Sequence, residues 1–274
     1  MIRKFNSTML LLVGLLATVS LQAQVLYEFS VSTDTYNDLE GTTSLTNGEL
    51  WDDPEYSAPI GFPFAITEET TETLHFVGLG GMLGAVDYYS QGDFVDWLMP
   101  FQADIIDRAY NMNDSLGVSN ISYKLEGQPG AQIFKMEWNN VGFFSDEEAQ
   151  DYVNFQLWLY EASNDFEVRI GASSVLNPES YEGIAGPAIG LTTVNNNSYD
   201  FTNVHFLEGD TNNPTFVNEF AYTYGAYFPY LQGTPANGTV YRFSRVLVGI
   251  DAPTINASEV TVFPNPSTDY VTVN

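Results

Sequence analysis

The sequence predicts an all-β protein whose main body is an antiparallel β-sandwich. Aromatic residues make up 15% of the 274 residues, and such side chains suit the pleated surface of a sheet. Short runs of alternating apolar and polar residues recur along the chain, with turn residues between them. No long amphipathic helical pattern interrupts these runs. We therefore expect about ten to twelve short strands in two packed sheets.

The clearest strands lie between residues 133 and 170. Three runs alternate with a period of two: Ile133–Trp138, Tyr152–Tyr160 and Phe166–Ile170. This period is typical of half-buried strands. The apolar faces of the three runs can form one wall of a core, and residues 161–165 are predicted to be the hairpin loop that joins the last two.

Other strands follow from the same alternation. Pro59 and Pro63 lack an amide donor, so the strand that contains them is expected at a sheet edge. Ser145 precedes several acids, which predicts a single helical turn over residues 145–150. Residues 94–106 fit a strand or a helical turn. Further strands are expected at residues 25–31, 57–66, 74–79, 121–125, 188–193, 201–207, 220–228 and 238–248.

The N-terminus predicts export. Arg3 and Lys4 precede an apolar run over residues 9–19, and the small residue Ala23 follows. This is the pattern of a secretory signal peptide over residues 1–23. The apolar run is about half as long as a membrane span and no later run is longer, so we expect no transmembrane segment.

The composition excludes several kinds of site and partner. The chain contains no cysteine, which excludes disulfides, thiolate metal sites and a cysteine nucleophile. The formal net charge is −27 at pH 7. A field of this sign repels nucleic acid and anionic membranes, and it favours solubility and cation binding. We therefore expect no nucleic-acid partner.

The C-terminus carries a second export motif. Pro264, Asn265 and Pro266 form a rigid turn between two alternating runs. This pattern resembles the start of the type A C-terminal sorting domain of type IX secretion cargo. The resemblance implies that the type IX machinery delivers the protein to the exterior or to the outer-membrane cell surface. It covers about sixteen residues, so we expect a truncated sorting domain. The predicted segments are a signal peptide (1–23), a β-sandwich (24–250), a linker (251–258) and the sorting domain (259–274).

The central region carries a looser resemblance. Gly61–Phe64, Glu137–Phe143 and Asn154–Glu161 form three sequence patterns that are similar to those of uncharacterised modules in such cargo. The last two strands also resemble the extracellular nidogen-like domain. The resemblance implies a sandwich of jelly-roll or nidogen-like type, and a fold alone implies no activity.

Catalytic motifs are sparse. The chain has two histidines, His75 and His205, and neither a Gly-x-Ser-x-Gly nor an HExxH motif. Glu137 and Glu167 are the best carboxylate pair for a polysaccharide hydrolase. Cross-strand pairing with basic residues explains the same two carboxylates as sheet stabilisation. We therefore expect a protein that is not an enzyme and keep the hydrolase as the alternative.

A binding surface is the stronger prediction. The hairpin register places Trp158 opposite Glu167 and Gln156 opposite Arg169 on one outward face. A flat aromatic ring beside amides can stack on a sugar or a peptide. In the opposing interpretation, a loop or a second sheet covers this face and Trp158 belongs to the core. The candidate ligand-binding residues are Trp158, Tyr152, Tyr160, Asn154, Gln156 and Glu137.

Calcium is a candidate ligand of the acidic loops. Asp52 with Asp53, and Asp93 with Asp96, offer hard oxygen ligands, as does Asp210 with its neighbours Asn212 and Asn213. None has EF-hand spacing, and solvated acidic loops explain the same residues.

These observations favour a secreted or cell-surface, non-enzymatic protein that serves in adhesion or binds glycan or extracellular matrix. A secreted hydrolase and a structural surface-layer component are the alternatives.

Overall fold

The computed structural model contains two compact units. One is Val25–Leu247, and the other combines Met1–Gln24 with Val248–Asn274. The predicted signal peptide lies outside the described residues. The structure describes residues 25–67, 70–87, 94–112, 116–198, 200–219, 227–247, 262–264 and 271–273.

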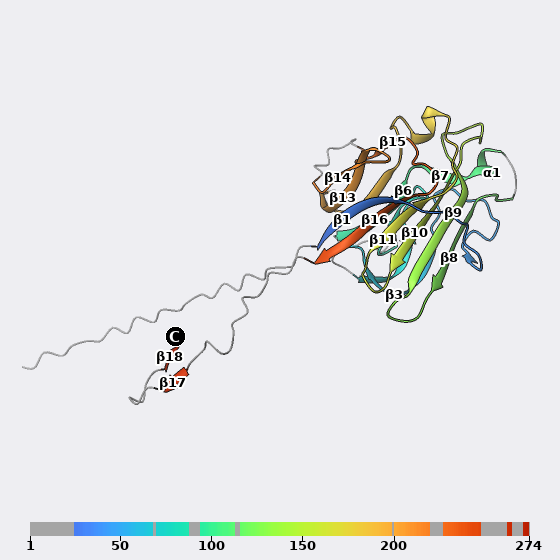
Figure 1. Cartoon of the computed structure of the whole chain (residues 1–274). Coiled ribbons are helices and arrows are strands. Elements are labelled where there is room, and N and C mark those ends of the chain that lie inside the picture. Colours follow the sequence, from blue (N-terminus) through green and yellow to red (C-terminus); the bar gives the residue numbers. More distant parts are fainter. Residues whose placement is uncertain are drawn as a thin grey trace, which may run out of the picture. The chain divides into compact units, whose positions relative to one another are not determined.

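The larger unit is a sandwich of two sheets, as predicted (Figure 1). In sheet A the three strands predicted between residues 133 and 170 are neighbours, and all the strand pairs are antiparallel. Its order is β1 (Val25–Thr33), β16 (Thr239–Leu247), β11 (Phe166–Ile170), β10 (Val153–Tyr160), β9 (Ile133–Phe143), β8 (Asn120–Glu126) and β2 (Thr43–Ser44), with β7 (Ile105–Asp107) also paired to β9.

Sheet B forms the second layer. The proline-containing strand β3 is at its edge, as the missing amide donors predict. Residues 94–106 form strands and not a helical turn. The order is β14 (Thr215–Val217), β13 (Asp200–Asp210), β12 (Ala188–Asn195), β6 (Phe94–Gln102), β5 (Leu83–Gly84), β4 (Thr70–Phe76) and β3 (Ser57–Ala65), with β15 (Leu231–Gln232) parallel to β13.

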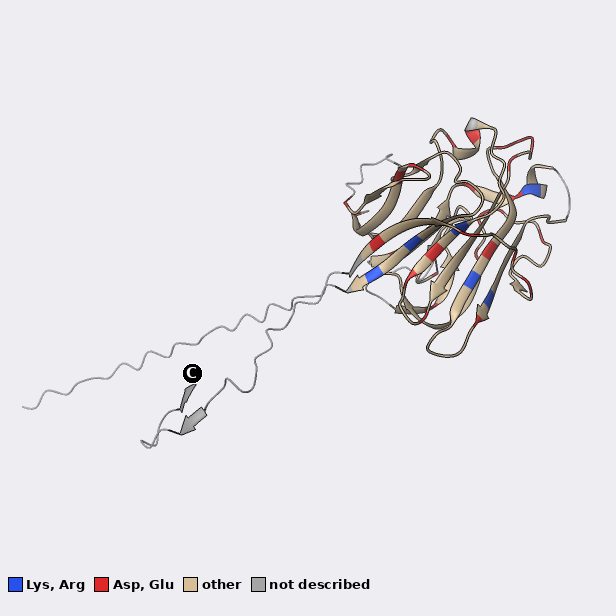
Figure 2. Cartoon of the chain, in the orientation of Figure 1, with Lys and Arg blue, Asp and Glu red and all other residues tan. Residues whose placement is uncertain are grey.

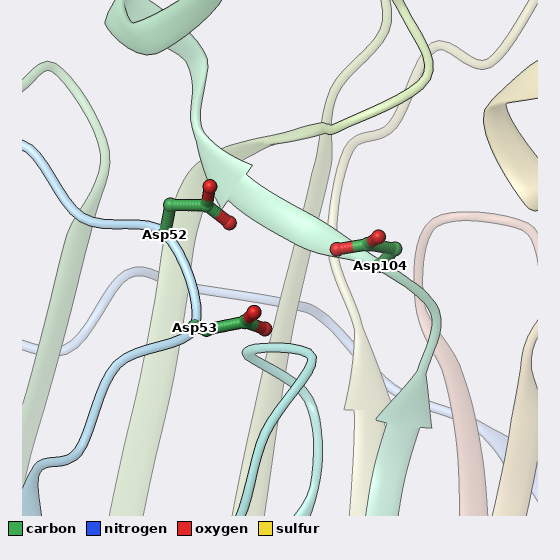
Figure 3. Close-up of side chains that lie close together, drawn as sticks. All are labelled: Asp52, Asp53 and Asp104. Carbon is green, nitrogen blue, oxygen red and sulfur yellow. The ribbon is translucent and has the colours of Figure 1, made fainter.

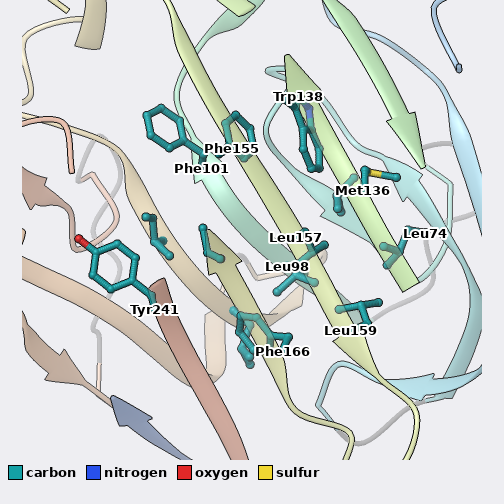
Figure 4. Packing of buried hydrophobic residues seen from close by; sticks show 14 of the residues in the cluster. Leu74, Leu98, Phe101, Met136, Trp138, Phe155, Leu157, Leu159, Phe166 and Tyr241 are labelled. Carbon is teal, nitrogen blue, oxygen red and sulfur yellow. The ribbon is translucent and has the colours of Figure 1, made fainter. Parts of the chain in front are cut away.

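Large rings join the two sheets in the core (Figure 4). Phe101 of β6 stacks on Phe155 of β10 at 5.0 Å between ring centroids, and Phe155 stacks on Trp138 of β9 at 4.6 Å. The Trp138 indole N–H donates to the carbonyl oxygen of Gly80 at 2.9 Å. The apolar faces predicted for residues 133–170 are confirmed, because their members are fully buried.

The helical turn predicted at residues 145–150 is wrong. These residues form turns, because the Ser145 hydroxyl donates to Glu182 and does not cap a helix. Ala149 has a positive φ of 51°, which ends any helical path. The helices of the described residues are α1 (Arg108–Asn111) and the 3₁₀ turn η1 (Pro178–Tyr181).

The smaller unit contains a strand pair. β17 (Val262–Pro264) is antiparallel to β18 (Val271–Val273), as the alternation around the proline turn predicts. Asn265 and Pro266 lie outside the described residues.

Within the described residues, no helix has the length and apolar character of a membrane span.

Candidate functional site

A row of charged and aromatic side chains crosses the outward face of sheet A. The strand register places Lys124 opposite Lys135, and Lys135 opposite Trp158. It also places Trp158 opposite Glu167, as predicted, and Glu167 opposite Arg242. The chain has eight Lys and Arg residues, and Figure 2 shows several of them on these strands. The basic residues of this face are Lys124, Lys135, Arg169 and Arg242.

Two of these cations hold Trp158. The Nζ atom of Lys135 lies 3.8 Å from the centroid of the Trp158 ring system, and Cζ of Arg169 lies 4.2 Å from it. These residues belong to the strands on either side of β10. The indole N–H donates to Oε1 of Gln156 at 2.9 Å. Each cation–π contact is worth about 0.5–1 kcal/mol at such a site, so the ring is fixed in orientation.

The two arginines of this face also form ion pairs with carboxylates of the strands and loops around them. Arg169 donates to Asp34 and, at 2.9 Å, to Glu167. Arg242 donates to Glu167 at 2.8 Å and to Asp165 at 2.7 Å. Glu167 is therefore bound by two guanidinium groups, and its pair with Arg242 of the neighbouring strand fits the predicted role in sheet stabilisation.

The crossing loop, residues 34–40, covers part of this face. Glu137 beneath it is 3% exposed and accepts hydrogen bonds from the Tyr36 hydroxyl at 3.0 Å, the Leu39 amide at 3.1 Å and the Gln156 side chain at 2.6 Å. Gln156 also donates to the Asn37 carbonyl oxygen at 2.8 Å. Burial raises the pKa of Glu137, although these donors oppose the shift. Glu137 and Gln156 thus anchor the loop.

A groove of about 530 Å³ lies between the crossing loop and the strands beside it. Trp158 is half-buried and forms part of its lining. The basic lining residues are Lys124, Lys135 and Arg169, and the acidic ones are Asp34, Asp38, Glu40 and Glu126. The groove is therefore lined by both basic and acidic side chains.

The other predicted binding residues lie outside the lining of this groove. Tyr152 packs under Arg108, with 5.1 Å from Cζ to the ring centroid, and Tyr160 packs under Arg242 at 4.9 Å. Asn154 accepts from the Asn140 amide at 2.6 Å and donates to the backbone carbonyl of residue 172. Of the six candidates, Trp158 and Gln156 line the groove.

A second group of interest is acidic. Asp52, Asp53 and Asp104 each place one carboxylate oxygen within 4.8 Å of the others (Figure 3). Such oxygens are the ligands that Ca²⁺ prefers. Asp104 follows β6, and no local spacing in the sequence connects it with the other two. The Leu79 amide donates to Asp53 at 2.9 Å, which holds the Asp53 carboxylate in place.

The remaining predicted metal ligands do not join this cluster. Asp93 lies outside the described residues. Asp96 is buried, and its carboxylate accepts hydrogen bonds from the backbone and hydroxyl of Thr67 and from the Thr193 hydroxyl at 2.7 Å. Asp210 accepts hydrogen bonds from two backbone amides within its own loop.

Burial, together with the crowding of carboxylates, raises the pKa of Asp104 to about 6. Burial is the largest cause, followed by the negative charges of Glu182, Asp53 and Asp52. Burial and the neighbouring Asp53 also raise the pKa of Asp52. The ionised cluster is therefore unfavourable at neutral pH unless a cation offsets its charge.

This shift predicts a pH-dependent gain from Asp104→Asn. A raised carboxyl pKa means that the folded state binds a proton more readily than the unfolded chain, so stability falls as pH rises from about 4 to about 6. We expect Asp104→Asn to raise the free energy of unfolding by about 1 kcal/mol at pH 7 after allowance for solvent screening. The gain should disappear near pH 4.

Urea denaturation in buffer with EDTA at both pH values measures this effect. Glu147→Gln, at an exposed position, is the matched control and should change neither value. A gain that is equal at both pH values would contradict the electrostatic explanation.

Fold and site together define a β-sandwich module with a polar groove on the outward face of one sheet. A family model described as NIDO related matches residues 26–245, and the chain belongs to this NIDO-related family. No curated protein and no solved structure gave a match. The matched range spans the sandwich, which confirms the nidogen-like part of the predicted resemblance.

Proposed function

We propose that the protein is a secreted or cell-surface module without enzymatic activity that binds a matrix glycan in the groove of sheet A. The groove over Trp158 carries this proposal. Every sugar hydroxyl both donates and accepts hydrogen bonds. A lining with three basic and four acidic side chains offers partners for both roles.

Charge supports a neutral glycan as the ligand. The basic and acidic side chains of the groove nearly balance, whereas the whole chain carries −27. A strongly acidic polymer would be repelled by the overall field. A neutral, hydroxyl-rich polymer meets no such barrier and can use the rigid edge of Trp158 as an apolar contact.

The motifs predicted at the two ends of the chain support the proposed location. The signal peptide predicted over residues 1–23 and the turn at Pro264–Pro266 support export by the type IX route. A NIDO-related sandwich agrees with an extracellular setting. A reporter fused to residues 1–23 should appear outside the cytoplasm, and its retention inside the cell would contradict the proposed signal.

Binding is tested on a glycan and matrix-protein array with Lys135→Met. This change removes the ammonium beside Trp158 and keeps an apolar stem of similar length. We expect the affinity for the bound glycan to fall about tenfold, which corresponds to roughly 1.4 kcal/mol. Leu176→Ser is the matched control, because Leu176 is 79% exposed and lies outside the groove.

Two results would overturn the proposal. One is a wild-type protein that binds no glycan and no matrix protein on the array. The other is equal affinity of Lys135→Met and wild type. Release of reducing sugar that is lost in Glu137→Gln would instead support the hydrolase alternative.

A further inference from the structure

A second apolar cluster lies on sheet B, away from the groove of sheet A. Met99 of β6 and Phe206 of β13 are fully buried members of this cluster. They belong to sheet B and are separate from the core between the sheets. The aromatic side chains Trp97, Phe201 and Phe228 pack against them and are partly buried. This face of sheet B is therefore apolar and rich in aromatic rings.

Beside this cluster is an aromatic pocket of about 340 Å³. Trp97 and Phe201 meet edge to face with their centroids 6.4 Å apart, and Phe201 meets Phe228 at 5.2 Å with perpendicular ring planes. Tyr227 also lines the pocket and is 57% exposed. The rings that line the pocket therefore stand at large angles to one another, and Phe228 also stacks on Phe206.

The charged side chains that line the pocket are acidic. Asp104 and Glu182 contribute carboxylates, and the lining contains neither lysine nor arginine. Neither carboxylate belongs to an ion pair within the described ranges. The charged groups that line the pocket are therefore both negative and have no ion-pair partner among the described residues.

We propose that the aromatic pocket binds the alkylammonium side chain of a lysine carried by a partner polypeptide. The four methylene groups of lysine would pack on the rings. Its ammonium is attracted by aromatic faces and by carboxylates. The net charge of −27 would also attract a basic partner and speed encounter. This inference is independent of the glycan proposed for the groove of sheet A.

The indole N–H groups provide a direct test, because the chain has four tryptophans. The indole groups of Trp51, Trp138 and Trp158 donate to acceptors in the protein. Nε1 of Trp97 is buried and has no hydrogen-bond partner within the described residues. Its NMR signal can be assigned by loss in Trp97→Phe and reports on the pocket.

The probes are Nα-acetyl-lysine N-methylamide and its norleucine analogue, which keeps the stem and lacks the ammonium. We titrate both into the full chain with ¹⁵N-labelled tryptophan. We expect the lysine probe to shift the Trp97 signal in a saturable manner, with about tenfold higher affinity than norleucine. Glu182→Gln should weaken the lysine probe about fivefold and leave the norleucine affinity unchanged. Glu147→Gln is the control and should change neither affinity.

Three outcomes would overturn the proposal. Equal affinity of the two probes would show an apolar pocket without preference for a cation. Absence of any Trp97 shift would exclude lysine from the pocket. A shift of the Trp158 signal alone would place lysine binding in the groove of sheet A, whose glycan proposal the array tests separately.

Discussion

Replacement of Trp138 by alanine is expected to lower the free energy of unfolding by about 4 kcal/mol. Trp138 is completely buried and stacks on Phe155, which in turn stacks on Phe101 of the opposite sheet. Alanine would leave a large cavity at this junction. It would also leave the buried Gly80 carbonyl oxygen without its indole donor, and an unpaired buried acceptor costs about 1–3 kcal/mol.

Urea denaturation of the full chain measures this loss. Trp138→Phe separates the two contributions, because phenylalanine keeps a ring in the stack and lacks the N–H. We expect that variant to lose about 2 kcal/mol. A loss of less than about 1 kcal/mol in the free energy of unfolding would be too small for a truncation in the core. That result for Trp138→Ala would show that the ring stack does not join the sheets.

Local alternation explains why the central strands were predictable from sequence. A period of two over residues 133–170 determines which side chains are buried, and the hairpin loop determines the register that pairs Trp158 with Glu167. The same reasoning fails at residues 145–150. There Ser145 finds a partner in Glu182, which is distant in sequence. Local helix signals cannot anticipate such a contact.

The groove and the acidic cluster are assembled by contacts between residues that are distant in the sequence. The crossing loop reaches Glu137 from about a hundred residues earlier in the chain, through Tyr36 and Leu39. A polar loop without alternation gives no indication of the face that it will cover. Asp104 likewise joins Asp52 and Asp53 only through the fold. The outward face around Trp158 is therefore predictable from the sequence, but the groove and the full acidic cluster are not.

Arg169 connects the crossing loop, the sheet and the groove, and Arg169→Met is expected to lower the free energy of unfolding by about 3 kcal/mol. Arg169 is 8% exposed. Its guanidinium binds Asp34 of the loop and Glu167 of its own strand, and it lies over the Trp158 ring. Removal of the charge leaves buried Glu167 with Arg242 as its remaining ion-pair partner, and partial loss of a buried pair is expensive.

Arg242→Met is the matched control for this effect, because Arg242 binds the same Glu167 carboxylate but its side chain is 37% exposed. We expect it to cost about 1 kcal/mol. Arg169→Lys should recover part of the lost stability, because it restores a positive charge. The recovery should be incomplete, because one ammonium cannot bind two carboxylates and a ring as a planar guanidinium does. If burial determines the cost, urea denaturation must show a larger loss in the free energy of unfolding for Arg169→Met than for Arg242→Met. Equal costs would mean that Glu137 and Gln156 hold the crossing loop without Arg169, and glycan binding in the groove should then survive Arg169→Met.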